Sequence, residues 1–412
     1  MQKILNRKYS ASQAINSSLM ATMLAFASIF LLDKGLANST IGFIIALSNV
    51  SSVIIQTFFA NFTAKHKSIE LQDMLTFMLI VIILASVTVF FAPSQLLFII
   101  AIIIAFSFAK SNVPFVNSLA FIYEDQGVEI NYGFGRGFGS LAYALVNLVL
   151  GFVIQQTTPG ILPLLYIGMA IVFIFIVRSF RLPEDTLGKN LEVNKPIEEA
   201  KNKRPSISIE EQSFAGFLSK YRTLIFAIIG LALVLFGHSI ISIYMIQIVT
   251  PIGGNSSTVG LAVFIAAGAE FPVMMNFDKL QKKKNAAFWL KTSMVFFILK
   301  IVIMYFATSL WMVYLSQFLQ FGAFALAYPA AVQYIKNGVD KKDLFKGQSF
   351  FTISTTMSSV CASLAGGLLI DYFGIGAMLF VALLVALVGG AIIFTTVNRV
   401  PQEQAAFARA QN

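Results

Sequence analysis

A small set of charged and polar side chains lies inside long apolar runs of the sequence. A charged side chain at the centre of a bilayer costs at least about 2.5 to 3.5 kcal/mol, so each one needs a partner, a water-filled cavity or a role. Carboxyl and imidazole groups can exchange protons, and amine, guanidinium and amide groups can hold a polar solute. The candidates are Lys110, Asn117, Arg136, His238, Glu270, Lys300, Gln317 and Gln320.

Glu270, Lys300 and His238 are the candidates for proton coupling. Removal from water favours the neutral form of a carboxyl group, so a glutamate within an apolar run is a natural proton acceptor. Lys300, on the next predicted helix, could tune Glu270 as a nearby cation. His238 ordinarily titrates near neutral pH, although a hydrogen-bonded structural histidine would fit the same position.

The remaining polar residues are candidates for solute binding. Arg136, in NYGFGRGFGSLAYAL, presents planar donors, or its side chain simply extends to the lipid headgroups. Lys110, in IAFSFAKSNVPFVN, lies too deep for that, which leaves a structural pair or a cavity position, and Asn117 follows it in the same run. Gln317 and Gln320 share one helical face and could bind a polyhydroxylated or amide-bearing solute, or a neighbouring helix.

The composition indicates an integral membrane protein. Of the 412 residues, 57% are hydrophobic and 12% are charged, whereas a soluble fold keeps about 25% charged residues. A spanning helix needs about 20 mostly apolar residues, so we expect an all-α membrane protein with twelve transmembrane helices. Their predicted ranges are 13–33, 40–62, 73–92, 97–121, 137–156, 161–179, 223–249, 257–276, 286–307, 310–335, 348–370 and 374–396.

One long hydrophilic segment, RLPEDTLGKNLEVNKPIEEAKNKRPSISIEEQS, separates the sixth span from the seventh. It predicts an N-terminal six-helix bundle at 1–180, a cytoplasmic linker at 181–220 and a C-terminal six-helix bundle at 221–412.

The basic residues gather on one side of this predicted topology. The formal net charge is +10, but the asymmetry matches the rule that cytoplasmic loops are rich in Lys and Arg. The charge therefore indicates orientation beside anionic lipid, not nucleic-acid binding. We expect both termini in the cytoplasm, with MQKILNRKYSASQ as a retained cytoplasmic tail, and insertion in the cytoplasmic membrane as a monomer.

The two halves contain a weak internal repeat. NSTIGFIIALSNVSSVIIQTFFANF opens the second span, and SSTVGLAVFIAAGAEFPVMMNFDKL opens the eighth, with Thr40 aligned on Thr258. Transporter folds are commonly built from such repeats, with the substrate held between them near the bilayer midplane.

Motifs of other functional classes are missing from the sequence. It contains no Walker A sequence, no HExxH and no GxSxG. The single cysteine, Cys361, excludes a disulfide framework and a multi-cysteine metal site. We therefore expect no enzyme activity, no metal and no cofactor. A channel would need matching rings of polar residues, which the halves do not supply.

The stretch FGRGFGSLAYAL resembles the fifth-helix entry of the lactose permease branch of the major facilitator superfamily, the oligosaccharide:proton symporters, and of their sugar-efflux relatives. In that family an arginine is followed three residues on by glycine and seven residues on by an aromatic residue, here Arg136, Gly139 and Tyr143. The resemblance implies two six-helix bundles, an Arg136 that holds sugar hydroxyls and a Tyr143 that stacks on a pyranose ring. Similar matches are FLLDKGLANSTIGFIIA, AAGAEFPVMM, YPAAVQYI and SLAGGLLIDYFG.

The sequence also departs from that family. The fourth-helix carboxylate falls in NSLAFIY, on Ser118 or Leu119, and the tenth-helix histidine and glutamate fall on Gln320 and Ala323. Galactoside specificity and the permease's own proton route are therefore not implied.

These observations predict a secondary active transporter, proton-coupled, that moves a sugar or similar small polar solute by alternating access of two bundles. Its expected partners are a small-molecule substrate, protons and the lipid bilayer. A sugar or multidrug efflux antiporter is the alternative within transport. The alternative of another class is a solute sensor with a transporter fold that binds without transport.

Overall fold

A computed structural model describes residues 2–66, 69–123, 129–180 and 214–398, and the described part is helical throughout, without β-strands. Most of the predicted linker at 181–220 lies outside the described residues. The helices of the first half are α1 (Gln2–Met20), the π-helix η1 (Ala21–Ala25), α2 (Ala27–Asp33), α3 (Asn38–Lys65), α4 (Leu71–Phe91), α5 (Gln95–Ser118), α6 (Tyr132–Gln156) and α7 (Leu162–Ser179).

The second half has more breaks within its helices. Its elements are α10 (Phe214–Lys220), α11 (Arg222–Ile243), α12 (Met245–Val249), α13 (Ser256–Met275), α14 (Phe277–Lys283), α15 (Ala286–Tyr305), α16 (Leu310–Phe318), the 3-10 helix η5 (Leu319–Phe321), α17 (Phe324–Gly338) and α18 (Leu344–Thr396).

The all-α membrane fold predicted from the sequence is confirmed. By length and composition, ten helical segments of the described chain could each cross a membrane, or eleven if the bent pair at 2–33 is one span. Helix α18 covers both of the last two predicted ranges, 348–370 and 374–396, and Gly374, with φ of 83°, interrupts its helical backbone at the start of the second range. The total of twelve stays a prediction.

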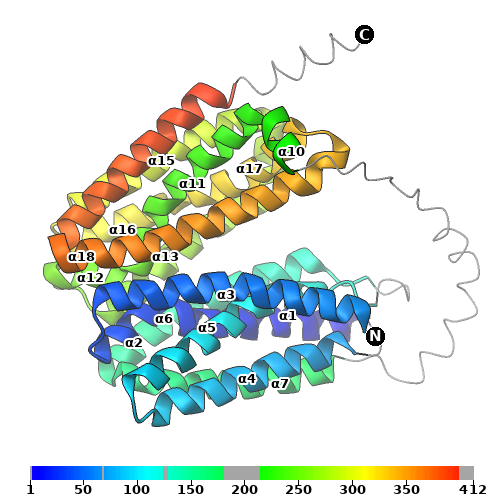
Figure 1. Cartoon of the computed structure of the whole chain (residues 1–412), viewed down its shortest axis with the longest axis vertical. Helices are drawn as coiled ribbons and strands as arrows, with labels where there is room; N and C mark the ends of the chain where they lie inside the picture. Colours follow the sequence, from blue (N-terminus) through cyan, green and yellow to red (C-terminus); the bar gives the residue numbers. More distant parts are fainter. Residues whose placement is uncertain (1, 67–68, 124–128, 181–213, 399–412) are drawn as a thin grey trace, which may run out of the picture.

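The two halves form two groups of helices that face each other (Figure 1). Helix α6 of the first half packs against α13 of the second, and α3 packs against α18. Large apolar side chains such as Phe58, Phe91 and Phe175 are exposed on the outside, as expected of a surface that faces lipid.

The first helix begins earlier than the predicted range 13–33. Helix α1 starts at Gln2, so the segment predicted to be a tail is helical. Its polar residues pack on the first half: Lys8 donates to the carbonyl of Ser179, and the Asn6 side chain accepts from the backbone of Asn131. The hydropathy of this segment does not predict a helix because these contacts are tertiary.

The internal repeat places two glycines at the contacts between the halves. A Cβ on Gly42 of α3 would lie 2.0 Å from the carbonyl oxygen of Ser363, and one on Gly260 of α13 would lie 2.4 Å from that of Asn147. Both positions therefore need glycine for close helix packing.

Hydrogen bonds join the halves mainly at one end of the molecule, which we call the closed end. Asp371 accepts from the backbone of Asn38 and Ser39 at 3.2 and 2.7 Å, and from the Asn38 side chain at 2.9 Å. Three more bonds link the halves there, from Ser28 to Ile243, from Gln247 to Asn38 and from Ser256 to Gly151. Between the described residues, no hydrogen bond joins the halves at the opposite end, where α6 begins and α13 ends.

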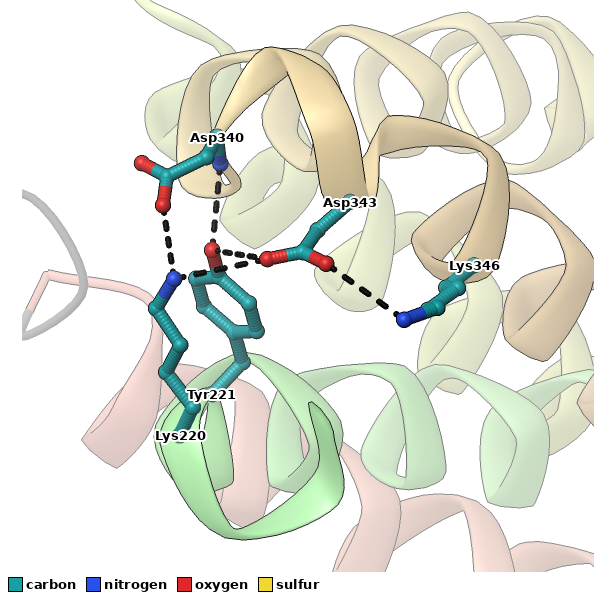
Figure 2. Close-up of polar contacts among 5 residues, drawn as sticks. All are labelled: Lys220, Tyr221, Asp340, Asp343 and Lys346. Carbon is teal, nitrogen blue, oxygen red and sulfur yellow. Dashed lines mark hydrogen bonds and ion pairs between the residues drawn. The ribbon is translucent and has the colours of Figure 1, made fainter. Parts of the chain in front are cut away.

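That opposite end contains a polar cluster within the second half (Figure 2). Lys220 pairs with Asp340 at 2.6 Å and with Asp343 at 3.4 Å, and the Tyr221 hydroxyl donates to Asp343 at 2.9 Å. Lys346 lies 3.8 Å from the other oxygen of Asp343. The cluster ties the start of α11 to the turn between α17 and α18, and the hydrogen bond from Lys220 lowers the pKa of Asp340.

Candidate functional site

A cavity of about 910 Å³ lies between the two halves. Both halves contribute polar side chains to its wall, and the cavity reaches Gly133 and Met275 at the end opposite to the closed end. Seven of the predicted site residues line it: Lys110, Arg136, Tyr143, His238, Glu270, Gln317 and Gln320.

On the side of the second half, one amide links the predicted acid to the predicted amine. Gln320 donates from Nε2 to Glu270 Oε1 at 2.7 Å, and its Oε1 accepts from Lys300 Nζ. Gln320 lies in η5, the 3-10 turn that directly follows α16. Because Gln320 both donates and accepts, the negative and positive groups are coupled through a single side chain.

Lys300 lies behind the cavity wall and does not line it. Its side chain is 1% exposed, and its Nζ also donates to Gln317 Oε1 at 3.2 Å. A buried ammonium is stable only when it is paired and hydrogen-bonded, so Glu270, reached through Gln320, is the charge that balances it. Lys300 thus contacts the cavity-lining side chains Gln317 and Gln320, and it has no place in the cavity wall itself.

His238 faces the cavity between aromatic rings. Its ring centroid lies 5.7 Å from that of Phe297 and 5.6 Å from that of Phe324. Nδ1 is buried and has no hydrogen-bond partner among the described residues. The arrangement leaves a polar ring atom available inside an apolar pocket, although no described contact joins His238 to Glu270.

On the side of the first half, Arg136 lies at the mouth of the cavity and is exposed. Its Nη1 donates to Asn117 Oδ1 at 3.3 Å, and Gln13 Nε2 donates to the same oxygen at 3.0 Å. Asn117 does not line the cavity. Its contact with the site is the hydrogen bond that it accepts from Arg136. Gln13 in turn donates to the hydroxyl of Tyr9 at 2.7 Å.

Lys110 lies deeper in the same wall. Its Nζ donates to Asn49 Oδ1 on α3, and the Asn49 amide donates to Ser359 Oγ of the second half at 3.3 Å. Lys110 is therefore linked, through the side chain of Asn49, to a hydrogen bond between the two halves.

Two residues of these hydrogen-bond networks, Gln13 and Asn49, were not predicted from the sequence. Gln13 lies in the segment predicted to be a tail, and Asn49 lies in LSNVSSV, a moderately polar stretch of α3. The signal available was polarity inside an apolar run, the same signal that identified Lys110. No group of His, Cys, Asp and Glu in the described chain is arranged to hold a metal ion.

This chain is similar to known protein families and structures over most of its length. The family model described as the MFS_1 like family matches residues 10–382. The maltose permease of Geobacillus stearothermophilus is 23% identical over 379 residues, which cover 90% of this chain and 89% of the permease.

Solved structures share the fold. The crystal structure of the nucleoside transporter NupG aligns with a TM-score of 0.74 at 10% identity and covers 96% of this chain and 98% of that one. The inward-open structure of the xylose transporter XylE from E. coli aligns with a TM-score of 0.68 at 11% identity, with 96% of each chain covered. At these identities the likeness concerns the fold alone.

Proposed function

The chain belongs to the MFS_1 like family of membrane transporters, which are not enzymes, and from this we propose that it is a proton-coupled transporter of a sugar or a similar small polar solute. It would work in the cytoplasmic membrane as a monomer, with both termini in the cytoplasm. The relative named a maltose permease supports a sugar as the class of solute.

The observation that carries the proposal is the cavity between the halves. Polar side chains of both halves line it, and cross-half hydrogen bonds lie mainly at one of its ends. A solute bound there contacts both bundles, so its binding energy can bias their relative position. Rocking of the bundles about this site is how alternating access would move the solute.

The link of Glu270, Gln320 and Lys300 supports proton coupling. When Glu270 is ionised, it balances Lys300 through the Gln320 amide. When Glu270 takes up a proton, its negative charge is lost, and the positive charge of Lys300 is no longer balanced across the Gln320 amide. A change in the position of the bundles that alters access to Glu270 would then release the proton on the other side.

Transport itself is tested by counterflow in proteoliposomes that contain the purified chain, with maltose and a panel of further sugars as solutes. Exchange of labelled solute against an internal excess is expected for a transporter. Binding without exchange, measured on the same preparation, would point to a sensor and contradict transport.

Coupling is tested with Glu270→Gln, which mimics the protonated form. A gradient of one pH unit is worth about 1.4 kcal/mol per proton, or about tenfold accumulation at one proton per solute. We expect Glu270→Gln to lose this accumulation and to retain counterflow.

The matched control is Glu129→Gln, the same change at an exposed position outside the cavity, which should accumulate like the parent protein. Accumulation by Glu270→Gln equal to that of the parent would exclude Glu270 as the coupling group. His238→Asn would then be the next variant, because imidazole titrates near neutral pH.

A further inference from the structure

The charges that line the cavity do not balance. Three ionisable residues other than histidine and tyrosine line it: the cations Lys110 and Arg136 from the first half, and the acid Glu270 from the second. The charge of Glu270 is already paired with that of Lys300, through hydrogen bonds to Gln320. The two cations of the first half are therefore left without an acidic counterpart in the described cavity wall.

Lys110 shows this most clearly because it lies deep in the wall. Its Nζ donates to the neutral amide oxygen of Asn49, and no carboxylate within the described residues forms an ion pair with it. An ammonium at membrane depth is stabilised by a counter-charge. The cavity beside Lys110 is the place from which a ligand could supply that charge.

Arg136 repeats the pattern at the cavity mouth. One of its donors binds Asn117 Oδ1, and it forms no ion pair with a carboxylate of the described chain. A guanidinium has five N–H donors in a rigid fork suited to anions. Since Arg136 is exposed at the mouth, it can attract an anion before the anion reaches Lys110.

The two cations occupy different levels of the wall. Lys110 and Asn117 are seven residues apart on α5, which is two turns or about 10 Å, and Asn117 holds Arg136. In this structure the two cations share no partner, because Lys110 donates to Asn49 and Arg136 donates to Asn117. The spacing fits a solute with its anionic group at Lys110 and its hydroxyls toward Arg136.

We propose that the solute is a sugar that carries an anionic group, with a carboxylate as in uronic acids and their glycosides as the form that one ammonium matches. The proposal rests on the sugar transport proposed above and specifies its substrate class. Lys110 is the residue that selects the anion, and Arg136 guides it in and binds its hydroxyls.

The experiment compares matched solutes that differ in charge. Binding to the purified full-length protein is measured for phenyl β-D-glucuronide against phenyl β-D-glucoside, and for glucose 6-phosphate against glucose. We expect the anionic member of at least one pair to bind about tenfold or more tightly, because hydrogen bonds to charged groups are the strong ones. The pair that shows the preference identifies the anionic group.

Lys110→Gln should remove that preference and leave the affinity for the neutral member within a few fold. Lys110→Arg keeps the positive charge and should retain the preference. This comparison distinguishes the loss of the charge from misfolding as the cause of the effect of Lys110→Gln. The control is Lys282→Gln, at an exposed cation of α14 outside the cavity, which should bind like the parent.

Equal or weaker binding of both anionic members, or a preference that persists in Lys110→Gln, would overturn the proposal. Counterflow of the neutral glucoside or glucose, without any preference for an anion, would do so while leaving sugar transport intact. Absence of counterflow for all four solutes and for maltose would count against sugar transport as well.

Discussion

At the scale of single residues, the polar groups found in apolar runs differ in what they contact. Arg136 lies at the cavity mouth, whereas Asn117, predicted to bind solute beside it, lies behind and accepts a hydrogen bond from it. Gln13 binds the same oxygen of Asn117. The guanidinium is therefore held in one orientation, and its planar shape, in addition to its charge, should matter for binding.

We expect Arg136→Lys to keep the charge and to weaken solute binding about five- to tenfold, since about one hydrogen bond worth on the order of 1 kcal/mol is lost. The protein should still insert and fold. Titration of the bound sugar into purified variants measures the effect. Arg178→Lys, in the exposed pair with Asp73, is the matched control, and unchanged affinity in Arg136→Lys would assign Arg136 to packing or lipid contact.

The sequence predicted which residues are costly in a membrane but not how they are joined. Glu270 and Lys300 were predicted to interact, and the structure places Gln320, predicted to bind either a solute or a neighbouring helix, between them. These three residues come from three different helical segments, α13, α15 and η5. Polarity identifies such residues one at a time, whereas their hydrogen bonds depend on tertiary packing.

At the scale of elements, the breaks within helices lie at the cavity. Leu24 and Ala25 of η1, Ser242 and Ile243 at the end of α11, and Gln320 of η5 all line it. Irregular backbone at membrane depth is tolerated where it lines a cavity or is buried in protein. Apolar runs predicted the spans, but these breaks have no hydropathy signal, so the sequence did not reveal them.

The polar cluster of Figure 2 offers a test of stability away from the cavity. Asp343 has a side chain that is 3% exposed, and it accepts from Tyr221 and pairs with Lys220 and Lys346. Asp343→Asn should destabilise the second half by about 1 to 3 kcal/mol, since a buried charged acceptor is lost, and lower the Tm in detergent.

Transport by the folded Asp343→Asn protein should persist, because the cluster does not line the cavity. Asp278→Asn, at an exposed position of α14, should leave the Tm unchanged. An unchanged Tm in Asp343→Asn would show that the cluster contributes nothing measurable to stability.

At the scale of the whole molecule, one carboxylate fastens the halves at the closed end. Asp371 of α18 accepts from two backbone N–H groups and one side chain at the start of α3, so it caps a helix of the other half. The equivalent start of α13 is capped locally by Asn255. The start of α3 is therefore capped by the other half, and the start of α13 is capped within its own half.

Asp371→Asn leaves one acceptor oxygen and removes the charge that favours a helix N-terminus. A cap is worth about 1 kcal/mol, so we expect the closed end to open about fivefold more often. The reporter is Ile45→Cys, a cavity position on α3, in a Cys361→Ala background. Its labelling by an impermeant thiol reagent added to intact cells should rise, because the predicted orientation places the closed end outside.

The control is Asp278→Asn, which should be labelled at the same rate as the parent. A labelling rate in Asp371→Asn equal to that of the parent would show that the close helix contacts at Gly42 and Gly260 keep this end closed without the cap.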